Sequence, residues 1–156
     1  MGLPPMCPRT LAPVVVALSM LLGCGGKSTA PTTYSITGIV TADGRPVAGA
    51  LVQYHPVNAD YTPLAADARA VGGQATTGDD GSYTVEATFD MGKTDVRGLP
   101  AGAYAVTVVK MDAGSGPASL DSPPKNVLDP RYAMVDTTPV KVTIEPEGRH
   151  DFDIPL

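Results

Sequence analysis

Short segments in which apolar and polar residues alternate constrain this chain more than any other feature of its sequence. Over Ser82–Phe89 every second residue is apolar, beginning with Tyr83, and polar residues fill the positions between. Val140–Glu145 repeats the pattern. A period of two residues is that of a β-strand with one buried and one exposed face. The fold must therefore bury one face of several such strands in a shared core.

About seven strands of this kind are expected, separated by turns. The 17 glycines and 16 prolines, with no tryptophan, favour turns and short strands over helices. The expected strands cover Tyr34–Ala42, Val47–Tyr54, Gln74–Thr77, Ser82–Phe89, Ala103–Met111, Val140–Glu145 and His150–Leu156. In Ala103–Met111 both faces carry apolar residues, so this strand is expected at the centre of a sheet. We predict an all-β domain over residues 34–156, an antiparallel β-sandwich with Greek-key connections.

Two stretches between these strands have no clear period. His55–Gly73 contains two prolines and several alanines, and a short helical turn is expected near Leu64–Val71. Asp112–Pro139 contains five prolines and no alternating segment. A connection of this length is uncommon inside a compact domain and is usually functional or mobile. An irregular strand connection remains the simpler interpretation of this segment.

The N-terminal segment has the features of an export signal in their usual order. Arg9 precedes a mostly apolar run of 12 residues, Leu11–Leu22, and Gly23 and Cys24 follow directly. A transmembrane helix needs about 20 apolar residues, so this run is too short to span a bilayer. A basic residue, an apolar run and a small residue at the cut are typical of a secretory signal peptide.

Leu21-Leu22-Gly23-Cys24 resembles the lipobox of bacterial lipoproteins, whose cysteine receives a diacylglyceryl group before the signal is removed. The resemblance implies a signal peptide over residues 1–23, cleavage between Gly23 and Cys24, and a lipid on Cys24. Residues 24–33 then form the lipidated cysteine and a small, polar tether. We expect an exported protein that is anchored to a membrane of the bacterial cell envelope without spanning it. Gly25, in place of an aspartate after Cys24, favours the outer over the inner membrane, by resemblance to enteric lipoproteins.

The cysteines argue against a disulfide-stabilised domain, and the net charge argues against a nucleic-acid-binding protein. Cys7 and Cys24 are the two cysteines, and removal of the signal takes Cys7 while Cys24 carries lipid. The remaining domain therefore has no disulfide and depends on its core for stability. Loss of Arg9 with the signal changes the formal net charge from −5 to −6. An acidic body argues against nucleic-acid binding, which uses clustered lysine and arginine.

Several turn and strand motifs resemble the carboxypeptidase regulatory-like domain. They are Gly38-Ile39-Val40 and the longer stretches Asp43–Ala50, Thr77–Tyr83 and Leu99–Val106. The resemblance covers nearly all of Tyr34–Leu156 and is closest to small bacterial lipoproteins made of one such domain. It implies a transthyretin-like (prealbumin-like) sandwich that acts as a non-catalytic accessory domain.

The last third of the chain extends this resemblance. Similar lipoproteins have a proline-rich segment with a Tyr-Asp-Pro-like motif and then a final hairpin. Asp129-Pro130-Arg131-Tyr132 followed by Val140–Leu156 is similar, with the order of the motif altered. These motifs mark turns and core positions, so they indicate a fold and no chemistry.

The sequence offers no set of residues for catalysis or for binding a metal. His55 and His150 are the two histidines, and neither lies in an H-E-x-x-H or H-x-x-E pattern. No G-x-S-x-G elbow and no calcium loop ending in glutamate occurs. We expect His55 at the exposed end of a strand and His150 on a hairpin surface. The chain is therefore expected to be no enzyme and to hold no metal or cofactor.

Two hypotheses about function remain. The first is a structural or protein-interaction module of the envelope, with Arg131 and Tyr132 as candidate binding residues because loops on a rigid scaffold often carry binding sites. The alternative is a carbohydrate-binding module, for which Tyr34, Tyr61 and Tyr132 would be the exposed aromatic residues. The expected partners are the membrane, through the lipid on Cys24, and an envelope protein or a glycan.

Overall fold

The computed structural model of the chain describes residues 2, 31–62, 70–89, 94–112 and 123–156. The regular structure of its described part is almost all strand, with one short 3-10 helix, which confirms the all-β class. The elements are β1 (Thr37–Ala42), β2 (Arg45–Pro46), β3 (Leu51–Val57), β4 (Gly73–Thr76), β5 (Ser82–Thr84), β6 (Glu86–Phe89), β7 (Thr94–Arg97), β8 (Gly102–Val109), β9 (Met111–Asp112), β10 (Lys125–Asn126), the 3-10 helix η1 (Pro130–Ala133), β11 (Lys141–Ile144) and β12 (Ile154–Pro155). The expectation of about seven strands is too low, because bends divide some strands and short pairings add others.

The strands form two larger sheets. One sheet has six strands in the order β11-β8-β3-β4-β6-β7, and all of its pairs are antiparallel. In the other sheet β1 pairs with β12, β2 and β5. A separate two-stranded pairing joins β9 to β10. As expected, β8 lies inside a sheet, between β3 and β11.

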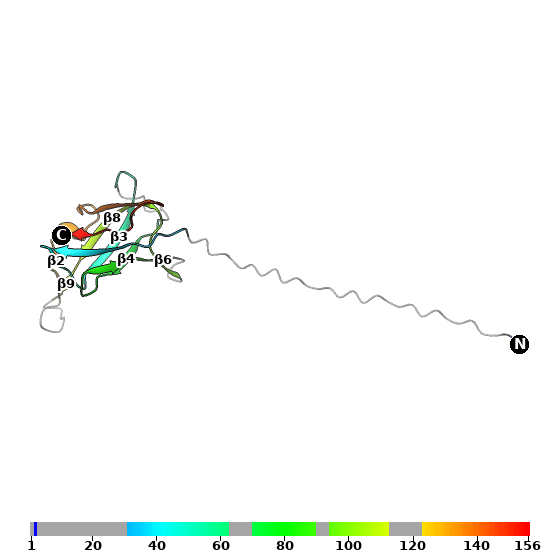
Figure 1. The fold of residues 1–156 in the computed structure, drawn as a ribbon, viewed down its shortest axis with the longest axis horizontal. Coiled ribbons are helices and arrows are strands. Elements are labelled where there is room, and N and C mark those ends of the chain that lie inside the picture. Colours follow the sequence, from blue (N-terminus) through cyan, green and yellow to red (C-terminus); the bar gives the residue numbers. More distant parts are fainter. Residues whose placement is uncertain (1, 3–30, 63–69, 90–93, 113–122) are drawn as a thin grey trace.

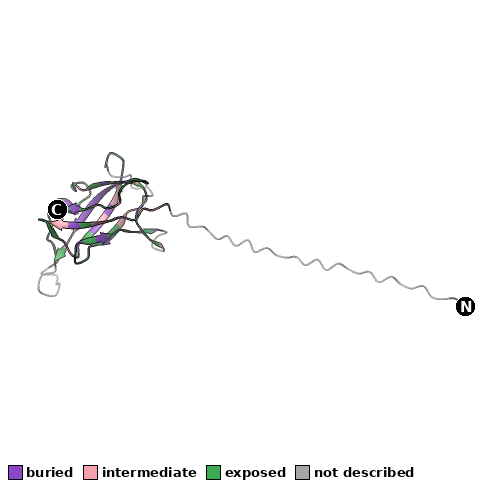
Figure 2. Ribbon diagram, viewed as in Figure 1, coloured by how far each residue is buried: buried purple, intermediate pink, exposed green. Residues whose placement is uncertain are grey.

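The two larger sheets share one hydrophobic core, an arrangement compatible with a β-sandwich (Figure 1). Fully buried members of this core come from both sheets, among them Val40 and Ile154 on one side and Val52, Val106 and Val108 on the other. Figure 2 shows the buried residues along the strands in the middle of the domain.

The segment Ser82–Phe89 keeps the predicted alternation but serves both sheets. Its burial alternates without interruption from Ser82 to Phe89. The chain bends at Val85, so β5 pairs with β1 while β6 pairs with β4 and β7. Val85 itself donates its amide to the Ile36 carbonyl at 2.9 Å and accepts from the Gly98 amide at 2.8 Å. One alternating segment therefore connects the two sheets.

The sequence Gly78-Asp79-Asp80-Gly81 predicts the turn of a β-hairpin, and the structure contains the turn but not the hairpin. The Gly81 amide donates to the Gly78 carbonyl at 2.9 Å, and the Asp80 carboxylate accepts from the Ser82 amide at 3.0 Å. The flanking strands β4 and β5 then enter different sheets. By contrast, Asp43 and Gly44 do close a two-residue hairpin between β1 and β2, with φ of 49° and 75° as a type I′ turn requires.

The C-terminal end of the fold differs from the expected final hairpin. The strand over Val140–Glu145 is confirmed as β11, which pairs with β8. After the turn the chain crosses to the other sheet, where β12 lies parallel to β1. The crossing segment is held by the Asp151 carboxylate, which accepts from the Thr37 hydroxyl at 2.5 Å, and by Asp153, which accepts from the Ile39 amide at 3.1 Å. Both carboxylates thus stabilise a parallel pairing that alternation alone does not reveal.

The described chain enters the domain at one end and stops toward the other (Figure 1). At the entry Tyr34 exchanges two backbone hydrogen bonds with Leu99, at 2.8 and 3.0 Å. Gly98, with φ of 90°, allows this pairing, because a Cβ there would collide with the Tyr34 carbonyl. Backbone hydrogen bonds therefore hold the first described residues of the domain to the turn before β8.

Two predicted segments fall partly outside the described residues. The helical turn near Leu64–Val71 does so for residues 64–69, and Ala70 and Val71 have no regular structure. Within Asp112–Pro139, residues 113–122 lie outside. The described remainder is more ordered than expected, because β10 pairs with β9 and Asp129 caps η1 by accepting from the Arg131 amide at 2.9 Å.

Candidate functional site

A groove of about 700 Å³ lies where the edges of the two larger sheets part. One wall is β11 and the residue pair before it, and the other is the crossing segment that leads into β12. Its lining residues are Tyr132, Pro139, Val140, Lys141, Val142, Arg149, Asp151, Phe152, Asp153, Ile154 and Pro155. Apolar side chains make up more than half of this lining. We call it the β11–β12 groove.

The β11 wall presents backbone groups that none of the described strands uses. The Val106 amide donates to the Val140 carbonyl at 2.9 Å, and Val142 is the partner of Tyr104 in the register with β8. In an antiparallel pair such hydrogen-bonded positions alternate, so the backbone groups of Lys141 and Thr143 point away from β8. Within the described residues, β8 is the one strand that pairs with β11. The groove is therefore bordered by a free strand edge.

Tyr132, one of the two predicted binding residues, lies in the wall of this groove but is buried. It is 5% exposed and belongs to the hydrophobic core, because η1 turns its ring toward β8. The prediction that Tyr132 is an exposed aromatic residue is therefore wrong. A short 3-10 turn after a proline gives no periodic signal that would have shown the direction of this side chain.

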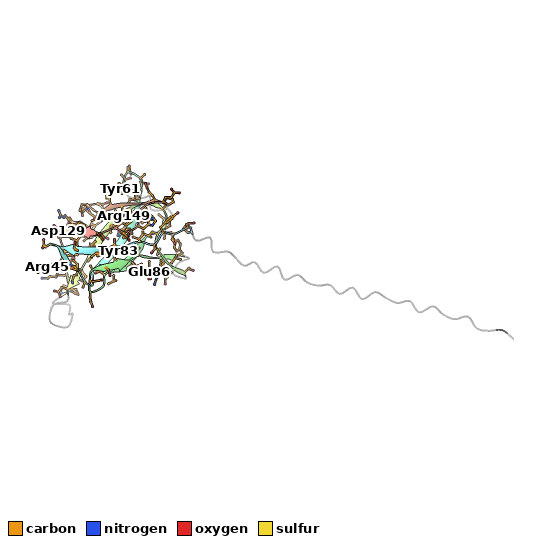
Figure 3. The ribbon with its side chains drawn as sticks, viewed as in Figure 1. Arg45, Tyr61, Tyr83, Glu86, Asp129 and Arg149 are labelled. Carbon is orange, nitrogen blue, oxygen red and sulfur yellow. The ribbon has the colours of Figure 1, made fainter. Side chains whose placement is uncertain are left out.

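Arg131, the second predicted residue, is exposed and lies against Tyr132. Its guanidinium group donates to the Tyr132 hydroxyl at 2.9 Å and sits 4.7 Å from the centre of the ring. Its Nε is 3.5 Å from a carboxylate oxygen of Asp129, which Figure 3 places toward the end of the domain away from the chain entry. The structure thus brings the two predicted residues together and holds the arginine beside the groove.

The charges of the groove are mixed. Lys141 and Arg149 form no salt bridge within the described residues. Asp151 and Asp153 lie on the opposite wall, and each already accepts a hydrogen bond from β1. The Lys141 ammonium group lies over the Tyr61 ring, so Arg149 is the cation among the described groove residues that remains open to a partner.

A second polar surface covers the outer face of the six-stranded sheet. Gln53 is the register partner of Gln74, and Gln74 is that of Glu86, so three side chains form a row across neighbouring strands. A shallow hollow of about 320 Å³ lies beside the row, with His55 and Gly72 also in its lining. None of the three side chains of the row has a hydrogen-bond partner within the described residues. We call this set the outer polar row.

The expected position of His55 is wrong. His55 lies within β3 and is half-buried, and its Nε2 is 2.9 Å from the Thr107 hydroxyl. Burial lowers the pKa of the His55 imidazole. The error arises because β3 continues through Pro56, whose missing amide hydrogen suggested the end of a strand. His55 thus satisfies a buried hydroxyl.

The remaining tyrosine candidates and His150 have structural partners. The Tyr61 hydroxyl is 2.8 Å from the Thr143 hydroxyl, and Lys141 Nζ lies 5.2 Å from the centre of the Tyr61 ring. The Tyr34 ring packs on the His150 imidazole with 5.1 Å between centroids. Both tyrosines are half-buried. Of the two, Tyr61 lies on the outer face of the six-stranded sheet, where the outer polar row also lies.

The described residues contain no group of three or more His, Cys, Asp and Glu side chains placed to hold a metal ion. Gly23 and Cys24, the predicted cleavage and lipidation residues, lie outside the described part of the chain. The residues of the β11–β12 groove were not predicted apart from Tyr132. Their proximity depends on the crossing between sheets, for which the sequence carries no local signal.

In the parts of the chain that the structure describes, no helix has the length and apolar character needed to cross a membrane. The chain matches no known protein-family model, and no curated protein or solved structure is significantly similar to it.

Proposed function

We propose that this chain is a lipid-anchored lipoprotein of the bacterial cell envelope whose domain is a non-enzymatic interaction module. The order of Arg9, the apolar run, Gly23 and Cys24 supports export and a lipid on Cys24. Anchoring by acyl chains needs no transmembrane helix. Gly25 after the cysteine favours the outer membrane.

For the domain itself we propose a transthyretin-like, Greek-key sandwich of the carboxypeptidase regulatory-like type. Its support is the order in which the chain visits the sheets: β1 lies in one sheet, β3 and β4 in the other, β5 again beside β1, and β12 finally beside β1. The tight turn at Asp43-Gly44 falls within one of the stretches that carry the resemblance.

The observation that carries the interaction role is the β11–β12 groove. It combines an apolar lining with the open guanidinium group of Arg149, and apolar and arginine side chains are enriched where protein partners bind. Among the described residues it holds no arrangement of acid, base and nucleophile that would point to catalysis. We therefore propose a protein of the envelope as the partner of this groove.

The test is site-specific photocrosslinking in the native bacterium with the full-length chain. A photoreactive amino acid replaces Pro139 or Phe152 in the groove, and Thr76 on the outer face serves as the matched control position. The proposal expects one recurrent envelope protein to be captured from both groove positions and not from Thr76. Capture of no protein from the groove positions would contradict it.

A carbohydrate-binding module remains a second candidate because of the outer polar row. Neighbouring strands are about 4.8 Å apart, so Gln53, Gln74 and Glu86 present open amide and carboxylate groups over about 10 Å, the span of a disaccharide. Such groups recognise sugar hydroxyls, and Tyr61 adds an aromatic edge to the same face. Calorimetric titration with envelope glycans tests this candidate, and Gln74→Ala with Glu86→Ala should abolish the binding. Equal binding by the double variant would exclude the outer polar row.

A further inference from the structure

Along the free edge of β11 only every second residue directs its backbone amide and carbonyl outward. This alternation restricts how another strand can join the edge. Val140, Val142 and Ile144 direct their backbone groups toward β8, so Lys141 and Thr143 supply the outward amides and carbonyls. The Glu145 amide continues this outward phase, while its carbonyl already accepts from Gly148 at 3.2 Å. The side chains of these three outward residues are exposed.

The same three residues form a charge pattern that is complementary to itself. An antiparallel copy of β11 centred on Thr143 places Thr143 opposite Thr143 and Lys141 opposite Glu145 at both ends. Opposite charges in directly paired positions stabilise neighbouring strands. A register centred on Lys141 would instead place lysine against lysine. The alternation of outward backbone groups and the pairing of opposite charges therefore favour the register centred on Thr143.

From this agreement we propose that two copies of the chain pair through β11, antiparallel and centred on Thr143. The pairing joins two six-stranded sheets into one continuous sheet. The Thr143 residues exchange two backbone hydrogen bonds, and each Glu145 amide donates to the Lys141 carbonyl of the other copy. Lysine on a strand edge normally prevents edge-to-edge contact, but here the register gives each lysine a carboxylate.

Among the residues that the structure describes, the surroundings of β11 leave room for this partner. The β11–β12 groove is open space beside the edge, so the second copy can approach without displacing a strand. Tyr61 holds the Lys141 ammonium group on the outer face, which is the face on which Glu145 of the second copy would lie. Pro139 and Pro146 flank the edge and limit the pairing to a short segment.

The two-fold symmetry closes the assembly at two copies, because each copy uses its single β11 edge. This inference does not depend on the lipid at Cys24. If both copies are anchored, a two-fold axis along the membrane normal brings both N-termini to the same height, so one bilayer can hold both.

Single cysteines in the full-length chain, purified in detergent and oxidised, test the register. Thr143→Cys should give a disulfide-linked dimer, since directly opposite Cα atoms in a hydrogen-bonded pair lie about 5.5 Å apart, within disulfide reach. Lys141→Cys is the matched control, because its two copies would lie about 13 Å apart along the strands. Lys141→Cys combined with Glu145→Cys should restore the link. The parent chain gives the background from its own cysteines.

Charge exchange tests the pairing without a covalent link. Lys141→Glu should weaken the dimer several-fold in sedimentation equilibrium of the full-length protein, and Lys141→Glu with Glu145→Lys should restore it. Equal crosslinking of Thr143→Cys and Lys141→Cys would overturn the register. A parent chain that stays monomeric at every concentration would overturn the proposal as a whole.

Discussion

The hydroxyl groups of Tyr54 and Tyr83 lie 2.9 Å apart and link the two sheets across the core. The Tyr83 hydroxyl also donates to the Phe152 carbonyl at 2.6 Å, so Tyr54 must be the donor in the bond between the two tyrosines. This chain of hydrogen bonds runs from β3 through β5 to the crossing segment that forms one wall of the β11–β12 groove. Figure 3 shows Tyr83 in the middle of the domain.

The direction of these bonds predicts unequal effects for two similar substitutions. Tyr83→Phe leaves both the Tyr54 hydroxyl and the Phe152 carbonyl without a partner, and should lower the free energy of unfolding by about 2–3 kcal/mol. Tyr54→Phe removes one donor and leaves Tyr83 bonded to Phe152, and should cost about 1 kcal/mol. Urea denaturation of the full-length variants measures both losses. A larger loss for Tyr54→Phe would show that the bonds run the other way.

Alkaline pH should destabilise the fold through the same tyrosines. Burial raises the pKa of Tyr54 from its ordinary value of 10.0 to about 12, although the hydrogen bond to Tyr83 opposes this, and burial also raises the pKa of Tyr83. Below pH 10 both the folded and the unfolded states keep these protons, so this contribution is fully present. Between pH 10 and 12 the unfolded state releases them first, and the free energy of unfolding falls, by at most about 1.4 kcal/mol per pH unit for each tyrosine.

Denaturation midpoints at pH 7, 9 and 11 check this dependence. We expect little change between pH 7 and 9 from the tyrosines, and a fall by pH 11 that is shallower in Tyr54→Phe than in the parent chain. An equal loss of stability in both proteins between pH 9 and 11 would show that Tyr54 does not cause this pH dependence.

Replacing each of two glycines with positive φ by alanine should destabilise the fold to different degrees. Gly98→Ala would bring its Cβ into the Tyr34 carbonyl and break the fastening of the chain entry, so we expect a loss of about 3 kcal/mol or more. Gly44, with φ of 75°, has open space around its Cβ position, and Gly44→Ala should cost about 1 kcal/mol from backbone strain alone. Thermal denaturation of the two variants compares them. Similar losses of stability in the two variants would show that the backbone at Tyr34 shifts readily to accept a Cβ at residue 98.

Substitutions of Arg131 and Tyr132 should differ in their effect on stability, because Arg131 is exposed and Tyr132 is part of the core. Tyr132→Ala should lower the free energy of unfolding by about 3–5 kcal/mol through the cavity it leaves. Arg131→Ala should cost less than about 1 kcal/mol, since its salt bridge with Asp129 is exposed on both sides. Chemical denaturation distinguishes the two. A Tyr132→Ala variant as stable as the parent would show that Tyr132 is a surface residue.

Much of the fold could be predicted because alternation reports burial directly. Tyr83, Val85, Ala87 and Phe89 are all buried as expected, and so are Val142 and Ile144 in β11. Alternation says which face of a strand is buried but not which strand lies beside it. The hairpin errors at Gly78–Gly81 and over Val140–Leu156 both have this cause, because partner choice depends on contacts far apart in the sequence.

The candidate site could be predicted only in part. The position of Tyr132 in a long connection predicts a binding role, and Tyr132 does line the groove, but its burial follows from the 3-10 turn that Asp129 caps. The opposite wall depends on the hydrogen bonds of Asp151 and Asp153 to β1. A polar residue that alternates with apolar ones is expected to face solvent, so alternation predicts no structural role for these two carboxylates.

Metabolic labelling of the native bacterium determines whether Cys24 carries a lipid. Cells that express the full-length chain or Cys24→Ala are grown with an alkyne fatty acid, and the purified proteins are examined for label and by mass spectrometry of the N-terminal peptide. We expect a labelled protein that begins at Cys24, and no label on Cys24→Ala. An unlabelled parent chain, or one that retains residues 1–23, would contradict this expectation.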